Sequence, residues 1–289
     1  MLRANRWICR DRSLSLETPL IMGIVNATPD SFSDGGLHAG ACGAIEWGLR
    51  LMKQGADILD VGGESTRPGA PEVNVDKELE RVIPVVEALV RAGAVVSVDT
   101  SKPQVMREAL SVGAHILNDV RSFTLPGAQE VAVDSDAGLV LMHMQGTPAT
   151  MQRCVTYEND DVTTSAIRFL QERDDALTAA GVNPDRICWD CGFGFGKTVE
   201  QNFELLAQTE RFVQCGRPYL MGLSRKSSIG AVPGVKAPQD RVVGSVVGAL
   251  LAAQRGAQVL RVHDVAQTKE GLAVWHATQK AGLTPKMKQ

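Results

Sequence analysis

Short apolar runs recur along the chain, and each ends at a polar or glycine-marked junction. The runs are Leu20–Val25, Ile58–Val61, Val95–Val98, Ile116–Leu117, Leu139–Met142, Ile187–Trp189, Tyr219–Leu223 and Val259–Val262. The residues that follow them are Asn26, Gly62, Asp99, Asn118, His143, Asp190, Ser224 and His263. Apolar runs of this length, bounded by turn residues, are typical of buried strands. The pattern therefore predicts eight strands.

Amphipathic segments of helical length lie between these runs. The clearest are Ala41–Gln54, Asp76–Arg91, Gln104–Ser111, Asp160–Ala180 and Arg241–Gln254. Glycines that suit a left-handed helix cap follow the predicted helices, at Gly55, Gly93, Gly113, Gly181 and Gly256. Alternating strands and helices favour a parallel sheet, and eight repeats favour closure into a (β/α)8 TIM barrel of the α/β class. No stretch between them is typical of a linker, so we expect one domain, with residues 1–18 as an N-terminal extension of unassigned structure.

Composition narrows the function classes. The chain has 289 residues, a net charge of -3 and a pI near 6.0, which gives no general attraction to nucleic acid or anionic membranes. No apolar run reaches the roughly 18 residues of a membrane span, and the charged N-terminus lacks a signal-peptide pattern. We therefore expect a cytoplasmic protein, whose six scattered cysteines are reduced thiols.

Three predicted strands end in an acid or an amide, at Asp99, Asn118 and Asp190. In a parallel barrel the carboxyl ends of the strands meet on one face, so these side chains are expected to converge. Together they can read the donor and acceptor pattern of a flat heterocycle. The alternative is that they cap the helices that follow them, a role that suits Asp and Asn.

Cationic side chains follow the last two predicted strands. Arg261 and His263 lie two residues apart in RVHD, so they share one face of a strand and suit phosphate oxygens. The alternative for this pair is an ion pair with Asp264 or a structural histidine. The segment SRKSSIG supplies four further groups where a short helix could begin, Arg225, Lys226, Ser227 and Ser228. They indicate a phosphate or carboxylate site, with a solvated basic turn as the alternative.

Two loops that follow strands, 26–40 and 62–74, are long, polar and rich in Gly, Pro, Ser and Thr, which is typical of mobile binding loops. The stretch CGFGFGKT lacks the first glycine of a P-loop, because Cys191 stands there, and we interpret it as a flexible loop. Cys188 and Cys191 form a CxxC, but no second pair supports a zinc site. No spacing selects a catalytic triad.

Several longer motifs together resemble one known family. They are MGIVNATPDSFSDGG, DVGGESTRPGA, SVDTSKP, LNDVRS, LMHMQGTP, GFGFGK, GLSRKSSIG and RVHDV, in order from Met22 to Val265. The set resembles the dihydropteroate synthases, which are (β/α)8 barrels and usually homodimers. The resemblance implies that 4-aminobenzoate is joined to 6-hydroxymethyl-7,8-dihydropterin diphosphate, with release of pyrophosphate and with Mg²⁺ present.

The resemblance also implies roles for single residues. Asp99, Asn118, Asp190 and Lys226 would hold the pterin ring, with Asp190 bridging the 2-amino group and a ring N–H. The residues expected to be catalytic are Asp99, Lys226, Arg261 and His263.

The diphosphate and the second substrate are assigned in the same way. Arg261 and His263 would grip the diphosphate with Asn26, which would also coordinate Mg²⁺. Ser227 would receive the 4-aminobenzoate carboxylate. The residues expected to close over both substrates are Phe32, Asp34, Thr66, Arg67 and Pro68.

The sequence departs from the family pattern at one point, where DPGFGFGK has Cys191 in place of proline. Because proline fixes φ and cysteine does not, the stiffness of this loop is in question. For the reaction we expect a dissociative substitution in which pyrophosphate leaves before the amine attacks. Two rival functions remain open: a pterin-binding methyltransferase with a corrinoid partner, and a catalytically silent pterin-binding paralogue.

Overall fold

The computed structural model describes residues 3–28, 36–65, 72–146, 151, 155–157 and 161–283. Its centre is a closed barrel of parallel strands in the order β10-β3-β4-β5-β6-β7-β8-β9. The strands are β3 (Leu20–Asn26), β4 (Ile58–Gly62), β5 (Val95–Asp99), β6 (Ile116–Asp119), β7 (Gly138–Met142), β8 (Ile187–Asp190), β9 (Tyr219–Met221) and β10 (Val259–Val262). The eight predicted strands and the TIM-barrel fold are confirmed.

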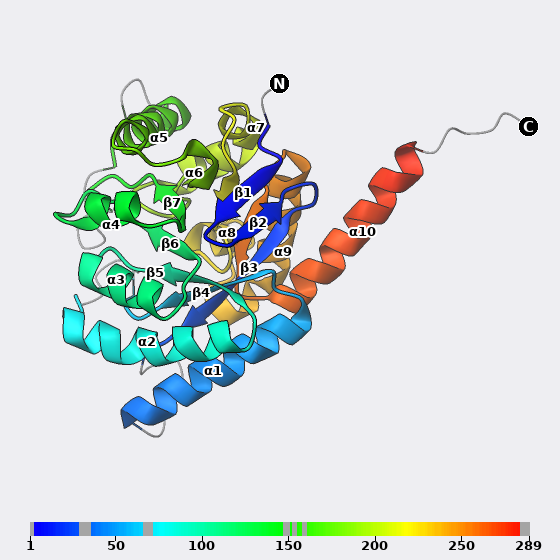
Figure 1. Ribbon diagram of the computed structural model, residues 1–289. Helices are drawn as coiled ribbons and strands as arrows, with labels where there is room; N and C mark the ends of the chain where they lie inside the picture. Colours follow the sequence, from blue (N-terminus) through cyan, green and yellow to red (C-terminus); the bar gives the residue numbers. More distant parts are fainter. Residues whose placement is uncertain are drawn as a thin grey trace, which may run out of the picture.

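Helices surround the barrel (Figure 1). The five predicted helices are confirmed within a few residues at each end, as α1 (Gly36–Gln54), α2 (Val75–Arg91), α3 (Pro103–Ser111), α5 (Val162–Ala179) and α9 (Val242–Gln254). The others are α4 (Ala128–Asp134), α6 (Val199–Ala207), α7 (Thr209–Val213), α8 (Ser227–Ala231) and α10 (Val265–Leu283), with short 3-10 turns η3 (Pro184–Arg186) and η4 (Pro238–Asp240). The glycines predicted as caps adopt positive φ, from 86° at Gly93 to 109° at Gly181.

The N-terminal extension forms a two-stranded antiparallel hairpin of β1 (Arg6–Cys9) and β2 (Arg12–Ser15). Its side chains Trp7, Cys9 and Leu16 are buried, and they pack on barrel residues such as Met22 and Val140. The Trp7 indole donates a hydrogen bond to the carbonyl of Arg186, 2.8 Å away, just before β8 begins. The hairpin therefore closes the end of the barrel at which the strands start.

A second apolar layer lies between the barrel strands and the helices and holds most of the buried residues. The five cysteines in the described residues are free thiols, and both members of the CxxC, Cys188 and Cys191, are buried. Among the same residues, no helix has the length and apolar composition that a membrane span needs.

Candidate functional site

Acidic, amide and basic side chains gather at the carboxyl ends of the barrel strands. Asp99 ends β5 and pairs in register with Asn118 of β6, while Asp190 ends β8 beside Met142. Asn118 is 5% exposed and Asp190 is 7% exposed, so both are largely removed from bulk water. The predicted convergence of these strand ends is confirmed by the closed barrel that carries them.

Arg261 of β10 joins two of these strands through a buried ion-pair network. Its Nε donates to Asp60 Oδ2 at 2.6 Å, and its Nη2 donates to Asp99 Oδ2 at 2.7 Å. The amide of Asn118 donates to the same Asp60 oxygen at 3.1 Å. Asp60 itself is fully buried, and its Oδ1 has no hydrogen-bond partner among the residues that the structure describes.

Burial raises the pKa of Asp99 to about 7, against the opposing attraction of Arg261. Repulsion from Asp60, Glu78 and Asp119 raises it further. For Arg261, burial lowers the pKa, but the carboxylates of Asp60 and Asp99 outweigh burial and raise it above its usual value. The site therefore holds a permanent cation next to a carboxyl group that can change its protonation near neutral pH.

Asp190 and Lys226 form the opposite wall of the site. The backbone N–H of Gly192 donates to Asp190 Oδ1 at 2.7 Å. The Lys226 ammonium donates to the carbonyl of Phe193 and lies 4.4 Å from the ring centroid of Phe195. Burial lowers the pKa of Lys226 to about 8 against the attraction of Asp190, whose own pKa is raised by burial.

The loop after β8 is held in place by several hydrogen bonds, which corrects the interpretation of CGFGFGKT as a flexible loop. Lys197 is 3% exposed, and its ammonium donates to the carbonyls of Phe195 at 2.8 Å, Gly192 at 2.9 Å and His143 at 3.2 Å. Gly192 has φ 67°, and a Cβ there would lie 1.8 Å from the His143 carbonyl oxygen. Lys197 and the close approach at Gly192 thus order the loop without the family's proline at residue 191.

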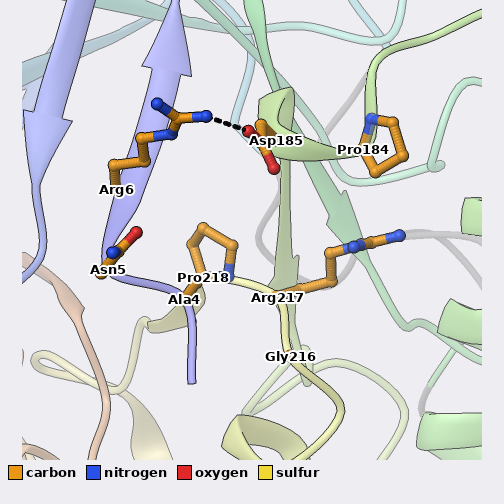
Figure 2. Close-up of a pocket in the computed structure, with 8 residues that line it drawn as sticks. All are labelled: Ala4, Asn5, Arg6, Pro184, Asp185, Gly216, Arg217 and Pro218. Atoms are coloured by element: carbon orange, nitrogen blue, oxygen red, sulfur yellow. Dashed lines mark hydrogen bonds and ion pairs between the residues drawn. The ribbon is translucent and has the colours of Figure 1, made fainter. Parts of the chain in front are cut away.

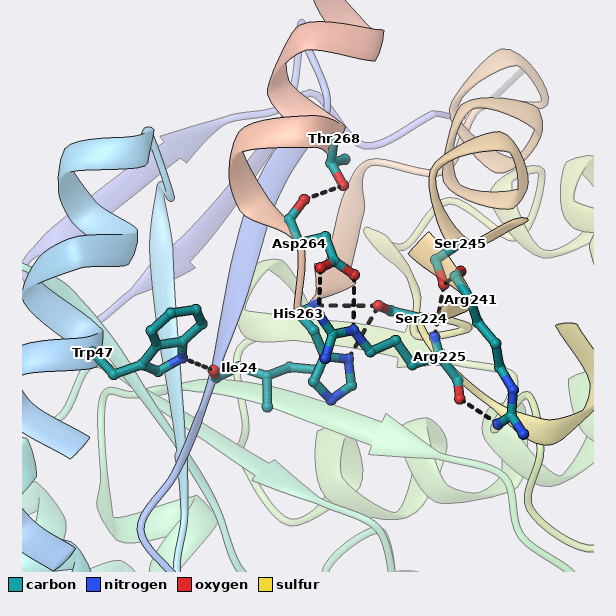
Figure 3. Close-up of polar contacts among 9 residues, drawn as sticks. All are labelled: Ile24, Trp47, Ser224, Arg225, Arg241, Ser245, His263, Asp264 and Thr268. Carbon is teal, nitrogen blue, oxygen red and sulfur yellow. Dashed lines mark hydrogen bonds and ion pairs between the residues drawn. The ribbon is translucent and has the colours of Figure 1, made fainter. Parts of the chain in front are cut away.

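His263 lies just beyond β10, and its imidazole Nδ1 is 3.1 Å from the Ser224 hydroxyl (Figure 3). The same hydroxyl accepts the backbone N–H of His263 at 3.2 Å. Ser224 therefore fixes the orientation of the imidazole. The neighbouring guanidinium of Arg225 is engaged in a two-point ion pair with Asp264 (Figure 3).

This pairing corrects part of the predicted anion cluster. The ion pair with Asp264 is made by Arg225 and not by Arg261 or His263, so Arg225 is unsuited to bind an anion. Ser228 is 4% exposed and accepts a hydrogen bond from Asn202 at 3.0 Å, which also removes it from the cluster.

Two predicted site residues are solvent-exposed. Asn26 is the last residue of β3, beside Gly62 of β4, and Ser227 is the first residue of α8. Among the described residues, no group of three or more His, Cys, Asp or Glu side chains is arranged to hold a metal ion. The predicted loop residues Phe32, Asp34, Thr66, Arg67 and Pro68 lie outside the described residues.

The alternative interpretation of the strand-end groups as helix caps is wrong. The N-cap of α3 is Lys102, and the N-cap of α6 is Thr198, which forms a capping box. Asp99 instead accepts from Arg261, Asn118 donates to Asp60, and Asp190 accepts from the loop that follows it. All three side chains therefore form hydrogen bonds at the carboxyl ends of the strands and do not cap the helices that follow.

Sequence reasoning missed two residues of this region. Asp60 lies inside an apolar run, which hides it among strand residues, yet a lone carboxylate within such a strand is itself a signal of a buried polar contact. Lys197 is the other, because neither the nucleotide motifs nor the family resemblance of GFGFGK indicates that its ammonium turns inward to backbone carbonyls.

A separate cavity of about 310 Å³ lies near the opposite end of the barrel, between the N-terminal hairpin and the segments before β8 and β9 (Figure 2). Arg6 and Asp185 form a 2.8 Å ion pair at its edge, and Arg217 lines it as well. Arg217 is also bound to the buried Asp174. The buried acids and the ammonium groups described above thus lie at the other end of the barrel from this cavity.

A parallel barrel with buried carboxylates and ammonium groups at the carboxyl ends of its strands defines a barrel enzyme with a site for a small polar ligand. The pattern of the family described as "Pterin binding enzyme" matches residues 22–263. The chain therefore belongs to the family of pterin-binding enzymes, and within it to the dihydropteroate synthases.

Three relatives illustrate the similarity, which extends along almost the whole of each of these chains. The chain is 49% identical over 273 residues to the dihydropteroate synthase of Haemophilus influenzae, an overlap of 94% of this chain and 98% of the relative. It is 50% identical to the solved Xanthomonas albilineans dihydropteroate synthase with 4-aminobenzoic acid, with a TM-score of 0.91 over 98% of this chain and 100% of that one. The Xanthomonas albilineans enzyme in complex with 7,8-dihydropteroate gives 48% identity and a TM-score of 0.87, over 97% and 100%.

Proposed function

We propose that this chain condenses 6-hydroxymethyl-7,8-dihydropterin diphosphate with 4-aminobenzoate to give 7,8-dihydropteroate and pyrophosphate. The observation that carries the proposal is the gathering of the buried Asn118 and Asp190 and the partly buried Asp99 and Lys226 at one barrel mouth, with Arg261 across it. Related enzymes crystallised with 4-aminobenzoic acid and with 7,8-dihydropteroate support the choice of substrates.

The pterin ring is recognised by matched donors and acceptors. The Asp190 carboxylate keeps one oxygen in the Gly192 hydrogen bond, and its other oxygen accepts from the 2-amino and ring N–H groups. Lys226, held by Phe193 and stacked on Phe195, donates to a ring acceptor. These groups are already desolvated in the free protein, so they contribute to binding without a large further ordering cost.

The diphosphate is bound by the cationic side of the mouth. Arg261 uses Nε and Nη2 for Asp60 and Asp99, which leaves Nη1 for a phosphate oxygen. His263, whose ring is oriented by Ser224, adds a second donor. Arg261 and His263 offset the charge that develops on the leaving pyrophosphate, which is electrostatic stabilisation.

The residues present fit a Mg²⁺ ion that is shared with the substrate. Mg²⁺ prefers oxygen ligands and is commonly held by one or two protein groups together with phosphates and waters. The exposed amide oxygen of Asn26, at the end of β3, is such a group. When bound, the ion would supply charge neutralisation to the diphosphate.

The second substrate is proposed to enter over α8, where Ser227 receives its carboxylate. The loop residues Phe32, Asp34, Thr66, Arg67 and Pro68 would close over both substrates and exclude water, which could otherwise capture the pterin cation as an alcohol. An aromatic amine is neutral near pH 7, so the attack on this cation needs no strong general base. We therefore favour a dissociative substitution, in which the bond to pyrophosphate breaks before the new C–N bond forms.

We also propose that the enzyme is a cytoplasmic homodimer. Val243, Val247 and Leu251 recur every fourth residue on α9 and are 76%, 49% and 38% exposed. Val274 on the adjacent α10 is 66% exposed. Exposed apolar side chains on two neighbouring helices are typical of an interface, here with a second copy of the chain.

One assay tests the reaction against its rivals. Purified protein is supplied with the pterin diphosphate and 4-aminobenzoate, with and without Mg²⁺, and both products are measured. We expect pyrophosphate and dihydropteroate in equal amounts, with both lost when Mg²⁺ is removed. Methyl transfer from methyltetrahydrofolate to a corrinoid acceptor, or pterin binding with no turnover, would contradict the proposal and support one of the rivals.

A further inference from the structure

A second buried charge cluster lies beside the proposed pterin site and has no part in the reaction as described above. The Lys102 ammonium, just before α3, donates to the carboxylate of Glu64 in the loop after β4 and to that of Glu78 on α2. The side chain of Lys102 is 15% exposed, that of Glu64 is 23% exposed and that of Glu78 is 1% exposed. Lys102 therefore links three different segments through largely desolvated ion pairs.

This cluster borders Asp99 directly. A small cavity of about 30 Å³ is lined by Asp99 together with Glu64, Glu78 and Lys102. Glu78 Oε1 has no hydrogen-bond partner among the residues that the structure describes, and Glu78 Oε2 accepts from Lys102. Lys102 is therefore the cation that balances the negative charge of Glu78. A buried carboxylate with a single ionic partner is strongly dependent on that partner.

The charges around Asp99 connect its ionisation to the ion pair between Lys102 and Glu78. The groups that act on it are Arg261 from β10, Asp60 from β4, Glu78 from α2 and Asp119 from β6. Arg261 is the main charge that lowers the pKa of Asp99, and the Lys226 ammonium also interacts with this carboxylate, whereas burial and the three acids raise the pKa. For Lys102, burial lowers the pKa, but the hydrogen bonds that its ammonium donates to Glu64 and Glu78 outweigh burial and raise the pKa, so the residue stays an ammonium at neutral pH.

We propose that Lys102 is a positioning residue of the pterin site, which neutralises Glu78 and Glu64 so that Asp99 can ionise and accept a hydrogen bond from the pterin. The inference rests on the proposed function, because it concerns how that site binds its ring. Lys102 acts through Glu78 and Asp99 and does not itself touch the ligand.

The test is a pH titration of equilibrium binding, with 6-hydroxymethyl-7,8-dihydropterin as the probe. This probe lacks the diphosphate, so binding does not depend on Mg²⁺ or on turnover. Wild-type binding should strengthen as pH rises through the ionisation of Asp99. In Lys102→Met the uncompensated Glu78 makes that ionisation harder, so the midpoint should move up by about one pH unit. Affinity at pH 7 should fall by up to about tenfold.

Companion variants separate charge balance from mere packing. Lys102→Arg keeps the positive charge and should restore most of the wild-type midpoint. The double variant Lys102→Met with Glu78→Gln removes one cation and one anion, and it should return the midpoint toward the wild-type value. Lys77→Met, which removes an exposed lysine beside Glu78 in sequence, should leave the midpoint unchanged, because exposed charges are screened by water and salt.

A second variant that keeps Lys102 separates charge balance from local unfolding of α2. Glu78→Gln alone removes a negative charge near Asp99 and should move the midpoint downward. An unchanged midpoint in Lys102→Met or in Glu78→Gln, with wild-type binding intact, would overturn this inference alone. A wild-type protein that binds no pterin at any pH would overturn the proposed function and this inference with it.

Discussion

The two ends of the barrel are built from opposite kinds of residue. At the end where the strands begin, Trp7, Cys9 and Leu16 of the hairpin fill the opening with apolar groups. At the end where the strands finish, Asp60, Asp190 and Lys197 are buried in the same barrel, and Asp99 is partly buried beside them. Buried charges are unfavourable for folding unless they are paired, whereas apolar closure is favourable. The comparison indicates that the apolar end stabilises the barrel, whereas the charged end lowers its stability and provides the groups that bind a ligand.

The largest effect on chemistry is expected for Arg261→Ala. The variant removes the cation that offsets charge on pyrophosphate and leaves Asp60 and Asp99 buried without it. We expect kcat/KM to fall by about a thousandfold, with stability reduced by roughly 3 kcal/mol. Steady-state kinetics and chemical denaturation measure both effects.

Arg261→Lys is the matched control for this variant. It keeps the positive charge but loses the planar fork, so it should recover stability better than activity. Pyrophosphate release by Arg261→Ala at close to the wild-type rate would contradict the assignment.

At the other end, Trp7→Ala should act on stability alone. The indole is fully buried and bonded to the Arg186 carbonyl, so its removal leaves a cavity and an unsatisfied acceptor. We expect the free energy of unfolding to fall by about 3–5 kcal/mol, while KM and kcat per folded molecule stay near wild type.

Ser13→Ala, at an exposed position of the same hairpin, is the control and should change neither quantity. A folded Trp7→Ala variant with an altered KM for the pterin substrate would show that the apolar end of the barrel influences binding at the charged end, which contradicts the comparison.

A smaller effect on activity is expected for Asp60→Asn, which weakens the anchor of Arg261 and Asn118. Activity should fall by about 10- to 100-fold. The sign of the pH effect follows from the charge. Repulsion from the Asp60 carboxylate is one of the causes that raise the pKa of Asp99 to about 7, so removing that negative charge lowers the pKa of Asp99. The acid limb of kcat/KM should therefore move to lower pH, and an upward shift would count against the network.

The smallest effect on chemistry is expected for Val247→Lys in the exposed stripe of α9. A charge there should disfavour association with a second copy, because apolar interface cores exclude unpaired charges. Sedimentation should show a lower association state with activity per chain within about twofold of wild type. Sedimentation of wild-type protein as a monomer would remove the basis for the homodimer.

The barrel could be predicted from the sequence because each buried strand is a short apolar run that ends at a polar residue. The hairpin β1–β2 could not, since its strands have only four residues each and β2 has no buried position, so they give a weak pattern. The helices α4 and α7, with seven and five residues, are too short to show a helical period. The polar helix α10 gives little amphipathic contrast.

Much of the candidate site was predictable for a similar reason, since Asp99, Asn118 and Asp190 end strands. What sequence could not show is which partner each charge takes. Arg225 pairs with Asp264, Lys197 turns inward to three carbonyls, and Lys102 joins two acids from distant segments. Such pairings depend on three-dimensional packing and leave no periodic signal.

The central claim is that the pterin ring binds at the polar end of the barrel. A crystal structure of this protein with 7,8-dihydropteroate tests it most directly. We predict that the ring lies within hydrogen-bond distance of Asp99, Asn118 and Asp190, with Lys226 on a ring acceptor. A ring bound at the opposite end, in the cavity lined by Arg6 and Arg217, with these carboxylates untouched, would contradict the account.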